Sequence, residues 1–553
     1  MLIKNEKLYR YAAWGIFALI FALILCTFRD YGITWDEELQ SQYGRAVVDY
    51  YASFFKDQSY DQIFNLYLYG GMFDGLASVI DHFTPFSTYE TRHLINALFG
   101  LLGLMGVWKL GCFLGARRTA QETTSGGAVG LVALILCATT PMYYGHMYNN
   151  PKDIPFAVGI IWTLYFMCRS YAKPTWRVLI RLGIIYGLTL GIRVGGVMLF
   201  MFWLAPMGIA ALLPLWKTRD MKTVRAVALS LWHRGWRIVL PVGVMSYVVM
   251  LICWPWAQQD PIMNPLRALH EFSNFPQIVD VLLDGTTYSS VKLPWFYVPL
   301  YFSVQLPEIL LFLLAVSVLF SPLMWRRMAP AQRQGITALS LMIAVPVSYA
   351  VIRRPALYDA VRHFLFVAPL VCIVAAVGAD TAFRWIIARF ENKKFRCAAG
   401  TVMLAAFALC IAGQIYIMVR LHPYEYIYAN ALTGGVHGAY GRYESDYWGS
   451  SFKEAAADLQ AYVAKEGGVP TGKIYRIAIC GPADAAMIYL PPDFRAVDAG
   501  DAAEFFLSTT RWKCQDMRPG KVIITVKRMG APLSVVKDLR GGYELLPGSP
   551  ADK

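Results

Sequence analysis

Long apolar stretches separated by short charged segments fill the chain up to residue 420. A transmembrane helix needs roughly 20 predominantly apolar residues. Windows near that length fall at residues 11–28, 94–115, 127–144, 154–172, 178–192, 195–215, 237–255, 300–324, 335–352, 363–381 and 397–419. The pattern predicts a mainly α-helical, polytopic membrane protein with about eleven transmembrane helices.

Residues 36–93, between the first two windows, are amphipathic and aromatic rather than continuously apolar. Charged residues interrupt the apolar faces of two segments in this loop, 38–55 and 62–83. Helices of this kind lie in the plane of the membrane interface. We therefore expect two interfacial helices in the first long loop.

The composition becomes polar after the last window. Short helices and strands are predicted there, with helices at 452–465, 502–506 and 533–539 and strands at 474–479 and 521–526. The chain is thus expected to have three parts: a membrane domain at 1–420, a connecting segment at 421–450, and a small α/β domain outside the membrane at 451–553.

Hydrophobic residues make up 57% of the chain and charged residues only 16%, which excludes an ordinary soluble domain. The net charge of +14 does not indicate nucleic-acid binding, because excess Lys and Arg in a membrane protein mark cytoplasmic loops. With the N-terminus inside, the cytoplasmic segments hold roughly twice as many basic residues as the opposite loops. The bias predicts a cytoplasmic N-terminus, a retained first helix and a C-terminal domain on the outer side.

Most of the cysteines lie in or beside apolar segments, where they pack as small hydrophobic residues. Cys480 and Cys514 instead lie in the polar C-terminal region. If that region is outside the cytoplasm, they can form a disulfide; two separate buried thiols are the alternative.

Three consecutive carboxylates, Asp36, Glu37 and Glu38, follow Trp35 just after the first apolar window. Acidic side chains held against a bilayer cost free energy and usually serve a function. The alternative is that they cap the helix that begins there, since acids favour helix N-termini.

Cationic side chains gather in the other outward-facing loops. They are Lys152, Arg193, Lys292, Arg353 and Arg362, and they are accompanied by Asp153, His363 and Tyr297. Cations at membrane depth suit the phosphate of a lipid carrier. A nearby carboxylate can accept the proton of a hydroxyl that attacks a sugar. Simpler roles remain open, because Arg353 can anchor the interface, His363 can be a satisfied loop histidine and Asp153 can cap a helix.

The Asp-Glu pair directly after the first span resembles the GT-C superfamily of integral membrane glycosyltransferases. The likeness is strongest to the family 39 branch, which includes protein O-mannosyltransferases and lipid A aminoarabinose transferases. It covers residues 1–420, with an N-inside topology, about eleven spans and two interfacial helices. In that family the Asp of the pair is the catalytic carboxylate, which corresponds to Asp36, with Glu37 beside it. The run Lys152-Asp153-Ile154-Pro155 matches the family's acid and proline at the fourth span, with Lys where Thr is commoner.

The resemblance implies an inverting transferase that moves a sugar from a polyprenyl-phosphate donor to an acceptor hydroxyl on a lipid, glycan or protein. It places the reaction at the outer face of the bacterial inner membrane, with a periplasmic C-terminal domain. Arg193, Lys292, Arg353 and Arg362 correspond by position to donor-binding cations. No cofactor is certain, although adjacent carboxylates leave room for a divalent cation.

Two other functions compete with this one. A secondary transporter or flippase for a lipid or sugar usually has internal repeats and ionisable residues near the midplane. The sequence shows no repeat, and its polar residues cluster on one face. A receptor or assembly scaffold would act mainly through the C-terminal domain.

Overall fold

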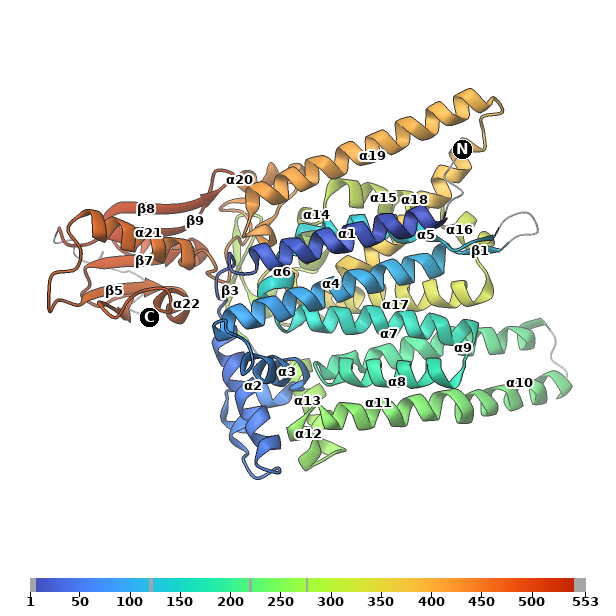
Figure 1. Ribbon diagram of the computed structural model, residues 1–553. Helices are drawn as coiled ribbons and strands as arrows, with labels where there is room; N and C mark the ends of the chain where they lie inside the picture. Colours follow the sequence, from blue (N-terminus) through green and yellow to red (C-terminus); the bar gives the residue numbers. More distant parts are fainter. Residues whose placement is uncertain (1–5, 119–122, 218–220, 275–276, 542–553) are drawn as a thin grey trace.

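The computed structural model describes residues 6–118, 123–217, 221–274 and 277–541. It has two parts, a bundle of long helices and a sheet domain that adjoins one end of that bundle (Figure 1). The long helices are α1 (Glu6–Thr27), α4 (Thr88–Gly115), α7 (Asp153–Ala172), α9 (Met198–Lys217), α10 (Met221–Arg234) with α11 (Leu240–Ile252), α17 (Pro330–Arg353), α18 (Val367–Ile387) and α19 (Lys393–Leu421).

Eight helices among the described residues are long and apolar enough to cross a membrane, or up to ten if each of two bent pairs is one span. The pairs are α5 (Gly127–Ala138) with α6 (Pro141–Asn149), and α14 (Tyr297–Gln305) with α15 (Glu308–Leu319). The window at 178–192 forms α8 (Trp176–Leu190), which packs on α7 and α11 but has only 15 residues. At 1.5 Å per residue it is about 22 Å long, shorter than a hydrocarbon core. The mainly helical membrane fold is confirmed, although one of the eleven predicted windows is too short to span by itself.

Proline accounts for both bends. Pro141 begins α6 and Pro307 precedes α15, and the paired helices meet at 65° and 118°. Because proline has no N–H and favours the first turn of a helix, each break starts a new helix rather than continuing the old one.

Helix α4 lies at the centre of the bundle, against α1, α5, α6, α7 and α18. Its first turn is fixed by a capping box, in which Ser87 Oγ accepts from Glu90 N and Glu90 Oε2 accepts from Ser87 N. At Gly111 an added Cβ would lie 3.0 Å from Gly130 Cα of α5. Small residues therefore let these two helices approach closely, as membrane helices commonly do.

The two expected interfacial helices are α2 (Glu37–Ala52) and α3 (Met72–Asp81), which pack on each other at the same end of the bundle as the sheet domain (Figure 1). The second is shorter than the predicted 62–83, because 3-10 turns at Ser59–Gln62 and Leu66–Leu68 precede it. A buried ion pair between Asp74 of α3 and Arg92 of α4 fixes the pair to the bundle.

Short elements complete the bundle. They are α12 (Pro255–Gln259), α13 (Met263–Asn274), α16 (Ser321–Arg327), α20 (Gly435–Ala439) and two hairpins, β1 (Arg117–Arg118) with β2 (Thr123–Thr124) and β3 (Asp280–Leu283) with β4 (Thr286–Ser289).

The sheet domain has five strands in the order β6-β5-β7-β9-β8. Strands β6, β5 and β7 are parallel, whereas β9 is antiparallel to both β7 and β8. Their bounds are β5 (Tyr475–Cys480), β6 (Phe494–Asp498), β7 (Phe505–Thr509), β8 (Lys521–Arg528) and β9 (Ala531–Asp538). Helix α21 (Phe452–Lys465) packs on β8 and β9, and α22 (Ala483–Met487) packs on β6.

The predicted helix at 452–465 and the strands at 474–479 and 521–526 are found, but the predicted helices at 502–506 and 533–539 are wrong. Phe505 and Phe506 begin β7, residues 502–504 are in neither a helix nor a strand, and residues 533–538 lie in β9. Every residue of β7 is buried, and a short apolar run buried on both faces has no periodicity that separates a helix from a strand. Backbone hydrogen bonds to the neighbouring strands determined that these segments are strands.

Cys480 and Cys514 form a disulfide between the end of β5 and the turn that follows β7. Removing it in a Cys480→Ala/Cys514→Ala variant should lower the free energy of unfolding of the sheet domain by about 2–4 kcal/mol, because the bond closes a loop with a separation of 34 residues. Thermal unfolding of the purified full chain measures this. The exposed free thiol Cys410 supplies the control, Cys410→Ala. Equal melting of the two variants would contradict the prediction.

Candidate active site

Asp36 lies where the chain leaves the bundle and enters α2. It occupies the N-cap position, but its side chain makes no capping hydrogen bond. The carboxylate is instead 40% exposed, and its Oδ2 lies 3.0 Å from Arg362 Nη1. Helix capping therefore does not explain this residue.

The loop before Asp36 is fixed from two sides. An added Cβ on Gly32 would overlap the carbonyl oxygen of Ser450, so only glycine allows this approach. Asn149, at the end of α6, donates to Gly32 O (3.4 Å) and to Ser450 Oγ (3.2 Å). The bundle and the connecting segment together set the position of Asp36.

Arg362 is buried at the start of the 3-10 turn Arg362–Phe364. Its Nε lies 2.9 Å from Asp359 Oδ2, and its guanidinium carbon lies 5.0 Å from the ring of Tyr358 and 5.5 Å from that of Trp448. Two carboxylates and two aromatic rings compensate the charge that burial would otherwise penalise.

Two further cations face the ring of Tyr69. Lys152 Nζ lies 4.0 Å from its centroid and the guanidinium carbon of Arg193 lies 5.8 Å from it. Arg193 Nη2 also lies 2.7 Å from Oδ1 of the buried Asp153. Asp153 is held in turn by Asn150, whose Nδ2 donates to Oδ2 and whose Oδ1 accepts from Asp153 N. Asp153, in the first turn of α7, thus orients Arg193.

Electrostatics couple these groups. Burial raises the pKa of Asp36, but Arg362 and Lys152 outweigh it and hold that pKa below its usual value. Burial lowers the pKa of Lys152 to about 8, although Asp36 opposes the shift. Burial and Arg362 together lower the pKa of His363 to about 3, so that its imidazole is neutral near pH 7.

Glu37 points away from this cluster, although the sequence grouped it with Asp36. Its carboxylate is fully buried, accepts from Thr34 N (2.8 Å) and Thr34 Oγ1 (3.1 Å), and lies 3.0 Å from His93 Nε2. The geometry makes it a support for the turn before α2 rather than a group that meets a substrate.

The other predicted site residues divide in two. His363 is half-buried beside Tyr358 and close enough to Asp153, Arg193 and Arg362 to interact with their charges. Tyr297 is buried and donates to Ala360 O (3.0 Å), so it supports the loop before Arg362. Lys292 and Arg353 are exposed, and no ion pair joins either to the cluster among the described residues.

Sequence reasoning missed Tyr69 and Arg511. Tyr69 is one of several tyrosines in the first loop, and nothing in the sequence marks it. Arg511 belongs to the sheet domain, yet its Nη2 lies 2.7 Å from Asp359 Oδ1. Only the tertiary structure brings Tyr69 to Arg193 and brings Arg511 to Asp359, the partner of Arg362.

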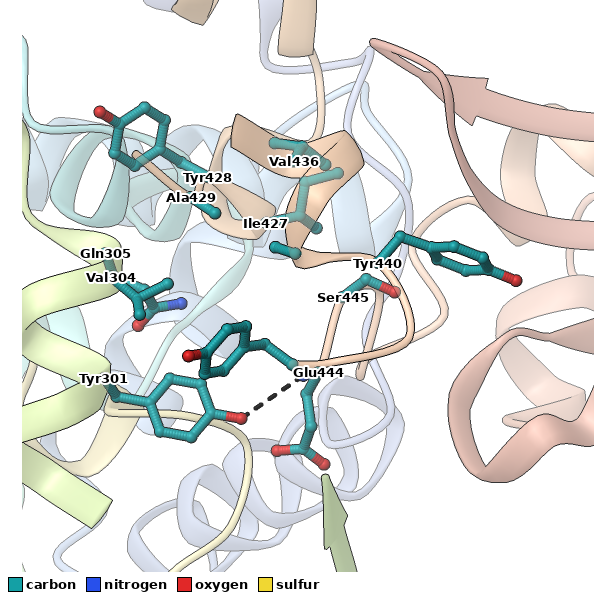
Figure 2. Close-up of a pocket in the computed structure, with 12 residues that line it drawn as sticks. Tyr301, Val304, Gln305, Ile427, Tyr428, Ala429, Val436, Tyr440, Glu444 and Ser445 are labelled. Atoms are coloured by element: carbon teal, nitrogen blue, oxygen red, sulfur yellow. Dashed lines mark hydrogen bonds between the residues drawn. The ribbon is translucent and has the colours of Figure 1, made fainter. Parts of the chain in front are cut away.

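A small cavity of about 10 Å³ is lined by Tyr301, Gln305, Tyr440 and Glu444 among others (Figure 2). Tyr301 Oη accepts from Glu444 N across it (3.4 Å). This volume holds about one water molecule, so the cavity is not a sugar site. No cluster of three or more His, Cys, Asp or Glu side chains that could hold a metal ion is found in the described part of the chain.

Residues 92–236, less than half of the chain, match the family model of dolichyl-phosphate-mannose-protein mannosyltransferases. The resemblance to GT-C membrane glycosyltransferases is confirmed. The matched segment contains Lys152, Asp153 and Arg193, whereas Asp36 and Arg362 lie outside it. No curated protein matches the sequence.

Solved structures are also similar to the chain. ArnT from Cupriavidus metallidurans bound to undecaprenyl phosphate is 14% identical, with 94% of this chain and 97% of that chain covered and a TM-score of 0.45. The oligosaccharyltransferase of Archaeoglobus fulgidus in its apo form is 13% identical, with 89% of this chain and 65% of that chain covered and a TM-score of 0.48. The resemblance to glycosyltransferases rests on the family match rather than on these overall likenesses.

The different surroundings of the two neighbouring acids are testable. Glu37→Ala should lower the free energy of unfolding by about 1–3 kcal/mol, because it leaves buried polar partners unsatisfied. Asp36→Ala should change the free energy of unfolding by less than about 1 kcal/mol, since Asp36 is part-exposed and Arg362 retains its ion pair with Asp359. Thermal unfolding of both purified variants compares them. Equal losses would contradict the assignment of Glu37 to a supporting role.

Proposed function

We propose that this protein transfers a sugar from a polyprenyl-phosphate donor to an acceptor hydroxyl, with Asp36 as general base. The observation that supports this most directly is the part-exposed carboxylate of Asp36, which lies against Arg362 and within electrostatic reach of Lys152. A site with both features can bind an anionic leaving group and accept a proton next to it.

Lys152, Arg193 and Arg362 hold the donor phosphate. The phosphate that links lipid and sugar carries one negative charge, whereas the released lipid monophosphate can carry two. Cations fixed in place therefore stabilise the leaving group more than the bound donor, which lowers the barrier. Asp153 and Asp359 keep the two arginines in position.

Asp36 acts on the acceptor. As the acceptor oxygen forms its bond to the anomeric carbon, the bond from that carbon to the phosphate oxygen breaks, and the hydroxyl proton passes to the Asp36 carboxylate. Attack from the face opposite the phosphate inverts the anomeric centre. The lowered pKa of Asp36 keeps its carboxylate ionised, which is the form that can accept the proton.

The site lies at the end of the bundle next to the sheet domain, and we place this end at the outer face of a bacterial inner membrane. Strand β1, which contains Arg117, and helix α16, which contains the exposed Arg326 and Arg327, lie at the other end (Figure 1), and Arg117 and Arg384 there pair with Asp380. The bias of basic residues supports a cytoplasmic location for that end.

The substitution Asp36→Asn should lower transfer about 10²–10⁴-fold, because the amide cannot accept the proton. Glu38→Gln is the matched control, because Glu38 lies two residues further on and accepts hydrogen bonds from Gln42 and Tyr89 rather than pairing with Arg362. Transfer of radiolabelled sugar from polyprenyl phosphate in proteoliposomes measures both. Normal transfer by Asp36→Asn, or solute uptake by the vesicles without any lipid-linked sugar, would overturn the proposal.

The pKa of about 8 for Lys152 predicts an alkaline limb in the pH profile of kcat/KM. Above that pH the free enzyme loses the ammonium that binds phosphate, so activity falls. Lys152→Arg should move the limb upward by more than about one pH unit, because arginine stays charged. On the acid side, activity should persist below the usual carboxyl pKa. An alkaline limb unchanged by Lys152→Arg would exclude this role for Lys152.

A further inference from the structure

Arg511 extends from the sheet domain to the loop that carries Arg362. It begins the turn after β7, and its side chain is only 10% exposed. Nη2 lies 2.7 Å from Asp359 Oδ1 and 3.1 Å from Glu444 Oε1, and Nη1 donates to Tyr447 O (3.0 Å). The guanidinium thus joins the turn after β7 to two other segments, the loop of Asp359 and the connecting segment of Glu444 and Tyr447.

Asp359 divides its two oxygens between two arginines. Oδ1 meets Arg511 while Oδ2 meets Arg362 Nε at 2.9 Å, which leaves Arg362 Nη1 directed at Asp36. Charges of alternating sign therefore run from the sheet domain to the proposed base. If Arg511 were absent, Asp359 would be free to rotate and to draw Arg362 away from Asp36.

The loop that holds Asp359 also depends on external contacts. Asp359 and Ala360 both have φ of 56°, a left-handed conformation that residues other than glycine keep only where their surroundings impose it. Glu444, a partner of Arg511, accepts from Ala360 N (3.2 Å). Tyr297 donates to Ala360 O. The contacts of Arg511 and Glu444 are thus part of what imposes this conformation.

A second contact joins the sheet domain to the site beside the first. Trp512, next to Arg511, meets Trp35, next to Asp36, with their ring centroids 6.2 Å apart. Trp512 Nε1 also donates to Asp280 O (2.9 Å) of the β3–β4 hairpin. The disulfide of Cys514 fixes the turn that carries both Arg511 and Trp512 to the end of β5.

We propose that Arg511 is a positioning residue for sugar transfer, so that the sheet domain completes the active site. It holds Asp359, and through Asp359 it directs Arg362 at Asp36 and at the donor phosphate. This inference rests on the proposed function. It assigns to the sheet domain a part in the reaction that neither the family match, which ends at residue 236, nor any sequence motif assigns.

The test compares two arginines of the sheet domain, Arg511, whose ion pairs leave the domain, and Arg540, whose ion pairs stay inside it. Arg511→Met should lower kcat/KM for transfer by roughly 10–100-fold, the loss typical of removing a residue that orients a ligand-binding group. Arg511→Lys should recover part of that loss, because lysine restores the positive charge but not the planar guanidinium that contacts several acceptors at once. Arg540→Met is the control, since Arg540 pairs with Asp538 and Glu466 inside the domain, and it should stay within about twofold of the parent.

Transfer and undecaprenyl-phosphate binding are measured on the full chain, with thermal unfolding to normalise for folded protein. A purely structural Arg511 would lower the melting temperature but leave kcat and KM of the folded fraction unchanged, and that result would overturn the inference. So would equal losses in Arg511→Met and Arg540→Met. If Asp36→Asn abolishes transfer while Arg511→Met does not, the proposed function stands and only the inference fails. If Asp36→Asn remains active, the proposed function fails, and the inference fails with it.

Discussion

The cost of burying Arg362 at the end of an apolar bundle governs the arrangement of the site. A guanidinium removed from water needs opposite charge and hydrogen-bond acceptors around it. Asp359 and Asp36 supply the charge, and the rings of Tyr358 and Trp448 cover the faces. Each partner then needs its own support, which explains why the surrounding loops are tied so closely to one another.

Under the proposed function, the same compensation prepares the site for an anion. Lys152, Arg193 and Arg362 face Asp36, Asp153 and Asp359, so the cations are already held in place before any phosphate arrives. A preorganised group loses little entropy on binding and does not need to reorient as charge develops. The part-exposed Asp36 is the member of the cluster that a substrate can reach most directly.

The bundle and the sheet domain are less separate than the polar composition after Arg420 indicates. The connecting segment meets the loop of Asp36 at Gly32, and Arg511 of the sheet domain meets Asp359 of the bundle. A salt bridge between two domains costs less conformational entropy where both surfaces are already ordered. The disulfide of Cys514 supplies part of that rigidity.

The sequence by itself determined the membrane class, the two interfacial helices and the prominence of Asp36, because apolar length and an acid at a span's end are local properties. It also named Arg362 and the Lys152-Asp153 pair, although it could not show which partner each would take. The tertiary structure alone separated Asp36 from Glu37, turned the expected helices near Phe505 and Leu533 into strands, and brought Arg511 to the site. These outcomes depend on which distant segments meet, and burial and pairing across such contacts outweigh local preference.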